Sequence, residues 1–354
     1  MSILGRYINY TVGGAIVIAL SLIVGLDIVS AVIDQLDKLQ GNYTFWQALN
    51  YVLMTIPGRI HEYIPLSVLI GCLAGMGLLA SSSEITVMRS SGVSLLKLML
   101  WAMRPVLIVV IVSLLISEYV SPVTDRWAKT HKDLKLWGES HSQVSSGGLW
   151  HKEDNTYMHF NVVQPGGVLY GLTFFYFDEQ QNLSLMRSAK RASFINDNWL
   201  LEDVIETQLS DTQVDSDAQK TLRWDTRITP ESLSFLANKP EEMSPSQLYQ
   251  YGSYLDENQL DNKPYRLAFW QKILQPLAVF SLVVIALSFV FGPLRATTIG
   301  FRVFVGIVVG IAFQFSQNLL GPASMIYGFS PLLAVCLPIV ACAGIGFVLL
   351  YRAG

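Results

Sequence analysis

Six long runs of apolar residues interrupt the chain, and each is close to the roughly 20 residues that a helix needs to cross a bilayer. The hydrophobic pattern therefore predicts six membrane-spanning helices. The first run is too long for the apolar core of a signal peptide, and no Ala-x-Ala site closes it, so it is expected to be a retained helix. The predicted spans are about Ile8–Ile33, Ile64–Ala80, Arg104–Val120, Ile273–Phe291, Val303–Leu320 and Pro331–Tyr351.

The pattern changes between the third and fourth runs, where short stretches of alternating apolar and polar residues recur. Turn-forming residues separate several of them, at Pro165-Gly166-Gly167, Asp178–Asn182 and Asn196-Asp197-Asn198. This pattern predicts an all-β domain, a jelly roll, sandwich or open barrel, inserted between two groups of three spans. The predicted strands are Tyr157–Val163, Val168–Phe177, Leu183–Arg187, Ala192–Ile195, Trp199–Thr207 and Thr221–Ile228.

Alternation within the second of these strands predicts a single apolar stripe, because side chains two residues apart lie on one face of a strand. Two interpretations of this stripe stay open, an ordinary domain core and an apolar trough for a lipid tail. The residues of the stripe are Val168, Tyr170, Leu172, Phe174 and Tyr176.

Two helical stretches are expected to join the β domain to the membrane. One runs from about Pro122 to Trp137, and the other begins near Ser244, which is a suitable N-cap with Pro245 at the first helical position. Three apolar residues would share one side of the second helix, namely Leu248, Tyr251 and Leu255. The predicted domains are residues 1–122, 123–263 and 264–354.

Charge supports the division between membrane and water. Charged residues make up only 14% of the chain, against about 25% in soluble proteins. Between Pro122 and Arg266 lie 14 Lys/Arg and 21 Asp/Glu, whereas the other 209 residues carry 10 and 6. This composition excludes a purely cytosolic enzyme and a disordered chain. The net charge of −3 gives no reason to expect nucleic-acid binding.

Basic residues orient the predicted spans, because they favour the cytoplasmic side. The short loops on the opposite side carry only Lys38 and Arg59. Both termini are therefore expected in the cytoplasm, with the β domain outside, which is the periplasm in a bacterium with two membranes. The seven basic residues on the cytoplasmic side are Arg6, Arg89, Lys97, Arg104, Arg295, Arg302 and Arg352.

The sequence carries no constellation typical of a membrane enzyme. There is no GxxxxGK[ST] P-loop and no GxSxG motif, and His61-Glu62 lacks the second His of HExxH because Pro65 stands there. No metal-ligand spacing occurs among the histidines, and the three cysteines lie in apolar runs. Asp27 and Glu118 are ionisable but lie toward the outer ends of their spans. The chain is therefore expected to be no enzyme and to hold no metal or cofactor itself.

The predicted cytoplasmic stretch from about 81 to 93 begins with three serines and continues as a short helix. Glu84 at its N-terminal end suits the helix dipole, Ile85 and Met88 would share one face, and Gly92 could end the turn. From the pattern alone, an amphipathic connector and a coupling helix that docks on an ATPase are equally open.

Several segments in the same order resemble the LptF/LptG family of lipopolysaccharide-transport permeases, and the resemblance covers essentially the whole chain. The 83–92 segment resembles the signature loop of that family, and the Phe-Gly-Pro-Leu-Arg run resembles the LptG branch more than the LptF branch. The segments are Asp34–Leu36, Ile56-Pro57 with Pro65, Ser83–Gly92, Gly147–Trp150, Trp270–Leu277 and Phe289–Arg295.

This resemblance implies a permease that pairs with an LptF-like paralogue on an LptB-like ATPase dimer, joined by an LptC-like single-span protein. Such an assembly extracts lipopolysaccharide from the membrane, and the β-jelly-roll domain passes it to an LptA-like periplasmic bridge. ATP and Mg would be bound by the partner ATPase. The residues expected to couple the chain to that ATPase are Glu84, Ile85, Met88, Arg89 and Gly92.

Cations near the outer membrane face are the expected contacts for the phosphates of lipid A, because charge-assisted hydrogen bonds recognise phosphate. Ordinary interfacial snorkelling of the same side chains is the open alternative. Lysines that the family often carries at the end of the first span are replaced here by Ala31 and Asp37. The candidate substrate-binding residues are Arg59, Tyr63, Lys129, Lys132, Asp34 and Lys38.

Three other functions stay open on the sequence alone. A related permease would use the same coupling helix to move another lipid or a lipoprotein. A membrane scaffold would only assemble partners through its external domain. An intramembrane enzyme is the least supported, because the catalytic constellations are absent.

Overall fold

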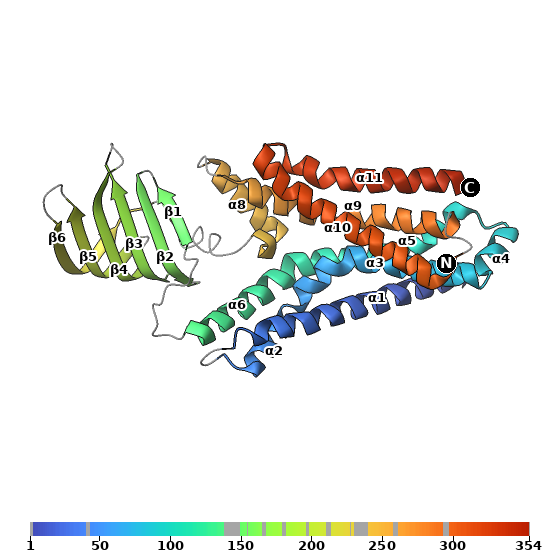
Figure 1. Ribbon diagram of the computed structural model, residues 1–354, viewed down its shortest axis with the longest axis horizontal. Coiled ribbons are helices and arrows are strands. Elements are labelled where there is room, and N and C mark those ends of the chain that lie inside the picture. Colours follow the sequence, from blue (N-terminus) through green and yellow to red (C-terminus); the bar gives the residue numbers. More distant parts are fainter. Residues whose placement is uncertain are drawn as a thin grey trace. The chain divides into compact units, whose positions relative to one another are not determined.

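Among the residues that the computed structural model describes, six helices are long and apolar enough to cross a membrane, which confirms the six predicted spans. In Figure 1 they run side by side within one helical body. The third membrane crossing continues from α5 through a π-helical turn, η1 (Ile116–Val120), into α6. The helices are α1 (Ile3–Leu36), α3 (Ile56–Ser81), α5 (Leu95–Leu115) with α6 (Ser121–Trp137), α9 (Lys263–Phe291), α10 (Ile299–Tyr327) and α11 (Pro331–Ala353).

The structure describes residues 3–39, 43–137, 149–153, 155–164, 168–178, 182–195, 198–209, 214–226, 228–229, 240–257, 261–292 and 297–353. Some predicted features therefore lie wholly or partly outside the described residues. These are the turns at 165–167 and 196–197, the middle of the turn at 178–182, the start of the 147–150 motif, and the end of the 289–295 motif.

The chain divides into two compact units. The first, the helical unit, comprises residues 1–132 and 240–354, and the second, the sheet unit, comprises residues 133–239. Each has its own apolar core, since one buried cluster lies among the helices of the first unit and another among the strands of the second, with Ile228 beside them. The short helices α2 (Phe45–Met54), α4 (Glu84–Ser90), η2 (Pro240–Glu242) and α8 (Pro245–Glu257) belong to the helical unit.

Glycines on α3 let it lie against α1 at very short range. A Cβ added at Gly71 would come within 2.5 Å of the Ile16 Cα, and one at Gly75 within 3.0 Å of the Val12 Cα. Both obstacles are backbone atoms of α1, so the glycines set the distance between the two helices. Small residues at such crossings are typical of helix packing in membranes.

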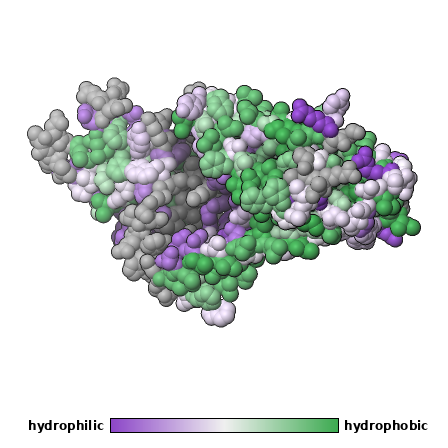
Figure 2. All heavy atoms as spheres, turned by 45° about the vertical axis from the view of Figure 1, so that its right-hand side comes forward, coloured by the Kyte–Doolittle hydropathy of each residue, from purple (hydrophilic) through white to green (hydrophobic). Residues whose placement is uncertain are grey.

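One end of the helical unit holds α4 together with both described chain ends (Figure 1). Helix α4 is separated from α3 by Ser82 and by Ser83, whose φ of 62° is left-handed and breaks the helix. Figure 2 shows a broad hydrophobic surface over the middle of the helical unit, with hydrophilic residues toward its ends. This distribution fits a bundle whose middle lies in lipid.

Helix α8 begins where the sequence predicts. The Ser244 hydroxyl accepts a hydrogen bond from the Gln247 backbone N–H at 3.2 Å, and the Gln247 side chain accepts one from the Ser244 N–H at 3.0 Å. This reciprocal pair is a capping box. The predicted apolar side is also confirmed, since Leu248, Tyr251 and Leu255 are all buried.

The sheet unit is a six-stranded antiparallel sheet in which each strand pairs with the next along the chain (Figure 1). The two predicted strands Leu183–Arg187 and Ala192–Ile195 are one continuous strand, and the first strand lies before the earliest predicted one. The strands are β1 (Leu149–Glu153), β2 (Thr156–Gln164), β3 (Val168–Phe177), β4 (Leu183–Ile195), β5 (Asn198–Leu209) and β6 (Val214–Trp224).

Aromatic contacts show that this sheet curls over its own core. Trp224 on β6 packs against Phe174 on β3 at a ring distance of 4.9 Å and against Phe160 on β2 at 6.1 Å. Strand β6 pairs only with β5 in the ladder, so these contacts require the sheet to fold round. The predicted jelly-roll class is confirmed in this sense: a curved, all-β, jelly-roll-like sheet inserted between two groups of three membrane helices.

The single stripe predicted on β3 is wrong at Tyr170. Leu169, Leu172 and Phe174 are buried, whereas Tyr170 is 36% exposed, so the buried side changes at Gly171. Gly171 has φ of 62°, a left-handed value that reverses the simple alternation of side chains. The same change occurs beside Asp203 on β5, whose φ is 52°.

Candidate functional site

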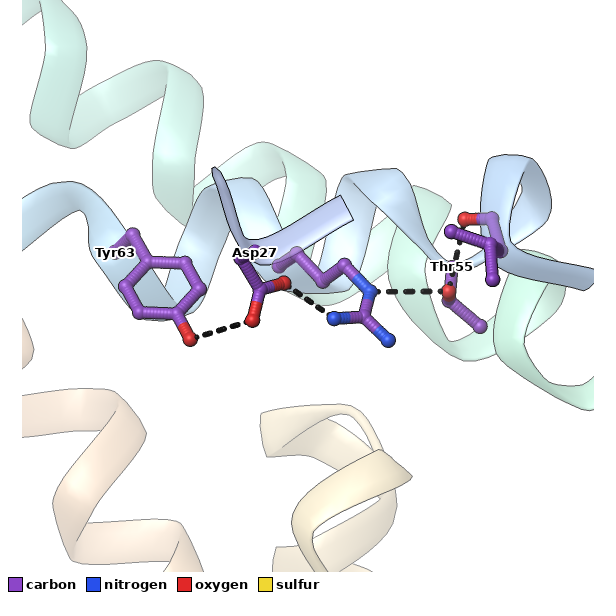
Figure 3. A network of polar contacts seen from close by, with 5 residues as sticks. Asp27, Thr55 and Tyr63 are labelled. Atoms are coloured by element: carbon purple, nitrogen blue, oxygen red, sulfur yellow. Dashed lines mark hydrogen bonds and ion pairs between the residues drawn. The ribbon is translucent and has the colours of Figure 1, made fainter. Parts of the chain in front are cut away.

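Asp27 on α1 lies at the centre of a polar network that contains two of the predicted substrate residues. The Tyr63 hydroxyl donates a hydrogen bond to one Asp27 carboxylate oxygen at 2.8 Å, and Arg59 forms an ion pair with the other. Figure 3 shows the Asp27 carboxylate between the Tyr63 ring and the guanidinium group, with both partners coming from α3. The network therefore joins the C-terminal part of α1 to the N-terminal part of α3.

The Arg59 guanidinium is held from a second direction by the start of α3. Its Nε donates to the Thr55 hydroxyl at 3.2 Å, and that hydroxyl donates to the Val52 carbonyl oxygen at 2.9 Å (Figure 3). The Arg59 and Asp27 side chains are only 23% and 19% exposed. Arg59 is therefore a fixed, partnered cation, since its charge is paired with Asp27 and its Nε donates to Thr55.

A second polar group gathers where α6, η2 and α9 meet. Lys129 on α6 forms an ion pair with Glu242 of η2. Asp125, one turn earlier on α6, accepts a hydrogen bond from the Ser121 hydroxyl at 2.8 Å. Lys272 on α9 donates to the Met243 backbone oxygen at 2.6 Å. This group places cations and carboxylates side by side.

A cavity of about 610 Å³ connects the two polar groups within the helical unit. Arg59 and Lys129 both line it, together with Lys272. Its other wall comes from α10 and α11, including Phe313 and Ile339. The volume is in the range of about 300–1,000 Å³ that is usual for ligand sites.

The other predicted substrate residues do not themselves line this cavity. Lys132 places its ammonium group over the ring of Tyr51, which does line it, 4.6 Å from the ring centroid. Asp34 and Lys38 lie exposed at the end of α1, and neither belongs to the described lining of the cavity. The structure therefore joins Arg59 with Tyr63 and Lys129 with Glu242, but it does not unite all six residues in one site.

The segment after α1 is held in place by Tyr43. This side chain is buried, and its hydroxyl donates a hydrogen bond to the Gln35 side-chain oxygen at 3.2 Å. Burial, with a smaller effect of nearby Tyr51, raises the pKa of Tyr43 to about 12, so the hydroxyl stays a neutral donor at physiological pH. Tyr43 thus fixes the turn that carries Lys38.

From the sequence, Asp27 was only a candidate catalytic residue. Asp125, Glu242 and Lys272 were not predicted to belong to a site. A lone carboxylate in an apolar span needs a partner, and that signal pointed to Asp27. Glu242 lies 113 residues from Lys129, so local pattern could not connect the two.

The predicted coupling residues divide between two environments. Ile85 and Met88 are buried in the core of the membrane helices, whereas Arg89 and Gly92 are exposed. Glu84 is half-buried at the start of α4 and accepts a hydrogen bond from the Ser82 hydroxyl at 2.8 Å. The outer side of α4 includes Val87, which is 62% exposed. The inner side is thus fixed to the bundle, and the outer side is open.

A family model described as the lipopolysaccharide export system permease LptF/LptG matches residues 6–352. The lipopolysaccharide export system permease protein LptG of Escherichia coli strain K12 is 33% identical over 340 residues, covering 95% of this chain and 94% of that protein. The LptG protein of Haemophilus influenzae is 32% identical over 338 residues, with the same coverage.

These comparisons confirm the resemblance that the sequence motifs indicate. They run through all six membrane helices and the inserted sheet unit, so fold and sequence agree over nearly the whole length. The chain therefore belongs to the LptF/LptG family and is a permease subunit for lipopolysaccharide export.

Proposed function

We propose that this chain is the LptG-like half of an ATP-driven lipopolysaccharide exporter in the bacterial inner membrane. It pairs with an LptF-like paralogue, sits on an LptB-like ATPase dimer that binds ATP and Mg, and works with an LptC-like single-span protein. The sheet unit passes lipopolysaccharide to an LptA-like bridge. Support comes from the family match over residues 6–352 and from the likeness to two LptG proteins.

The proposed orientation puts α4 and both termini in the cytoplasm and the sheet unit in the periplasm. Figure 1 supports it, because α4 and both described chain ends lie at one end of the helical unit. Arg6, Arg89 and Arg352 are carried by those segments, and basic residues favour the cytoplasmic side.

The coupling proposal rests on the position of α4, which is buried on one side and exposed on the other. Ile85 and Met88 pack into the core of the membrane helices, so a force applied to α4 is transmitted to that core. The exposed side offers Glu84, Arg89 and Val87 to a partner. Ile85 and Met88 then transmit the movement inside the chain, while the exposed residues contact the ATPase.

Replacing Glu84 tests this proposal. In Glu84→Gln the side chain keeps its size and its acceptor for Ser82 but loses its charge. We expect the complex to lose most of its bound ATPase when purified from membranes, with transport falling in parallel. Asp217→Asn, an exposed carboxylate of the sheet unit, is the matched control and should behave as the natural chain does. Full ATPase retention and transport in Glu84→Gln would show that the charge has no coupling role.

We propose that the phosphates of lipopolysaccharide contact Lys132, Lys38, Arg59 and Lys129 at the outer end of the helical unit through charge-assisted hydrogen bonds. A phosphate at Arg59 would displace Asp27, and one at Lys129 would displace Glu242, because these two cations are paired with those carboxylates. Tyr63 and Asp34 complete the same region as polar neighbours. A permease for a neutral lipid or a lipoprotein is the second candidate, and it would not need these cations.

Charge reversal separates the two candidates. Lys132→Glu should reduce lipopolysaccharide-stimulated ATP turnover of the reconstituted complex by about tenfold, the loss expected for one charge-assisted hydrogen bond. Lys135→Glu, one turn further along α6 and exposed, makes the same charge change and should have little effect. Equal effects of the two variants would assign no special role to Lys132.

A further inference from the structure

The cavity in the helical unit carries an unusual mixture of charge for a site near an anionic cargo. Four carboxylates line it, from Glu62, Asp125, Glu241 and Glu242. Only three cations, Arg59, Lys129 and Lys272, line it with them. The lining is thus slightly negative rather than positive. An anionic headgroup alone would be repelled by the surplus of carboxylates.

The three cations are also not equally available. Arg59 is paired with Asp27 and Lys129 with Glu242. Lys272 instead donates to the backbone oxygen of Met243. It also interacts electrostatically with Asp125 and Glu241, which places these opposite charges near one another. The charged end of the cavity can therefore offer a positive group and negative groups to one ligand at the same time.

Polar and apolar lining residues are separated along the helices. On α9 the lining runs from Ala268 through Lys272 to Leu282, a rise of about 21 Å. The charged Lys272 lies near the Ala268 end, and Leu282 lies at the other end. On α10 the polar Gln314, Gln317 and Asn318 all follow the apolar lining residues Gly310 and Phe313. Such a cavity suits an amphiphile with a polar head and an apolar chain.

We propose that this cavity binds a zwitterionic phospholipid with a primary ammonium group, as in phosphatidylethanolamine, separately from the exported lipopolysaccharide. The ammonium lies beside Asp125 and Glu241, two of the carboxylates near Lys272. The phosphate lies at Lys272, and an acyl chain follows the apolar end past Leu282 and Phe313. The ligand matches both signs of charge in the lining, whereas a purely anionic lipid matches only one.

The first test uses the purified natural complex in mild detergent and native mass spectrometry. It is titrated separately with phosphatidylethanolamine and phosphatidylglycerol that carry identical acyl chains, so the lipids differ in the headgroup. We expect one phosphatidylethanolamine per chain, held at least about tenfold more tightly than phosphatidylglycerol, the ratio expected for one charge-assisted contact. Equal retention, or preference for phosphatidylglycerol or lipopolysaccharide, would overturn the proposal.

Two variants then locate the bound lipid. Asp125→Asn should lower phosphatidylethanolamine retention and raise relative retention of phosphatidylglycerol, because the lining loses a negative charge. Lys272→Gln should lower retention of both lipids, since both carry the phosphate. Asp217→Asn in the sheet unit should leave retention unchanged. Retention of both lipids equal to that of the natural complex in both cavity variants would place the lipid elsewhere. If a variant fails to fold, the headgroup preference of the natural complex decides the question.

Discussion

Asp27 and Arg59 illustrate how opposite charges can be retained near the ends of membrane helices. Each side chain is mostly buried, so either charge alone would be strongly disfavoured there. Tyr63 and Thr55 supply hydrogen bonds that engage the remaining polar atoms. The network therefore depends on all of its members, and removing one leaves the others without compensation.

Asp27→Asn should consequently destabilise the helical unit more than the double variant Asp27→Asn with Arg59→Gln. The single change leaves the Arg59 charge unpaired at a cost of about 1–3 kcal/mol, whereas the double change removes both charges. Thermal unfolding in detergent of the natural chain, Asp27→Asn and the double variant gives their order of stability. A double variant less stable than Asp27→Asn would show that the unpaired charge is not the cause.

His151 on β1 predicts a pH dependence of the sheet unit. Burial lowers the pKa of His151 below its usual value of 6.5, and Glu153 only partly opposes this effect. The unfolded state therefore binds a proton more readily than the folded state. The stability that the neutral His151 ring contributes is fully present above about pH 6.5. It is lost as the pH falls from there through the lowered pKa of the folded state.

Hydrogen exchange of the intact chain can test this expectation. The backbone amides of β1 should exchange faster as the pH falls from about 7 to about 5, after correction for the intrinsic rate, since His151 lies on that strand. In His151→Gln, which has no titrating ring, the pH-dependent part should disappear. The same dependence in both chains would assign it to other groups.

At the scale of helices and strands, some features follow from the sequence and others do not. The six spans are confirmed because a membrane helix must be apolar over its full length, and α8 is confirmed because Ser244 and Pro245 mark its start locally. The change of buried side at Gly171 was missed, because alternation alone does not reveal a left-handed residue inside a strand. The Lys129–Glu242 pair was missed because it joins segments far apart in sequence.

The close contact of α1 and α3 allows the packing of these two helices to be tested by substitution. Gly71→Val should destabilise the helical unit by about 1–3 kcal/mol, because its Cβ would meet the backbone of Ile16 and the helices must separate. Gly14→Ala on α1 is the control, since its added Cβ meets nothing within 4 Å, and it should be neutral or stabilising. Thermal unfolding in detergent distinguishes the two, and a neutral Gly71→Val would show that α1 and α3 can move apart freely.

For the molecule as a whole, the division into two units suggests that two tasks are separable. The helical unit holds α4 and the cavity, and its core is built without any strand residue. The sheet unit has its own aromatic core around Trp224. Coupling to an ATPase and transfer of lipopolysaccharide to a bridge are therefore proposed to reside in different parts of one chain.

Replacing residues 138–239 by a flexible Gly/Ser linker should separate these tasks. The helical unit should still fold and retain the ATPase, because α4 remains fixed through Ile85 and Met88. Lipopolysaccharide release to the periplasmic bridge should fall to background, since the sheet unit that would receive it is gone. Purification of the complex measures ATPase retention, and release from proteoliposomes measures lipopolysaccharide transfer.

Adding Glu84→Gln to the shortened chain is the control for coupling and should remove the ATPase. Undiminished lipopolysaccharide release without the sheet unit would show that transfer does not pass through the sheet unit.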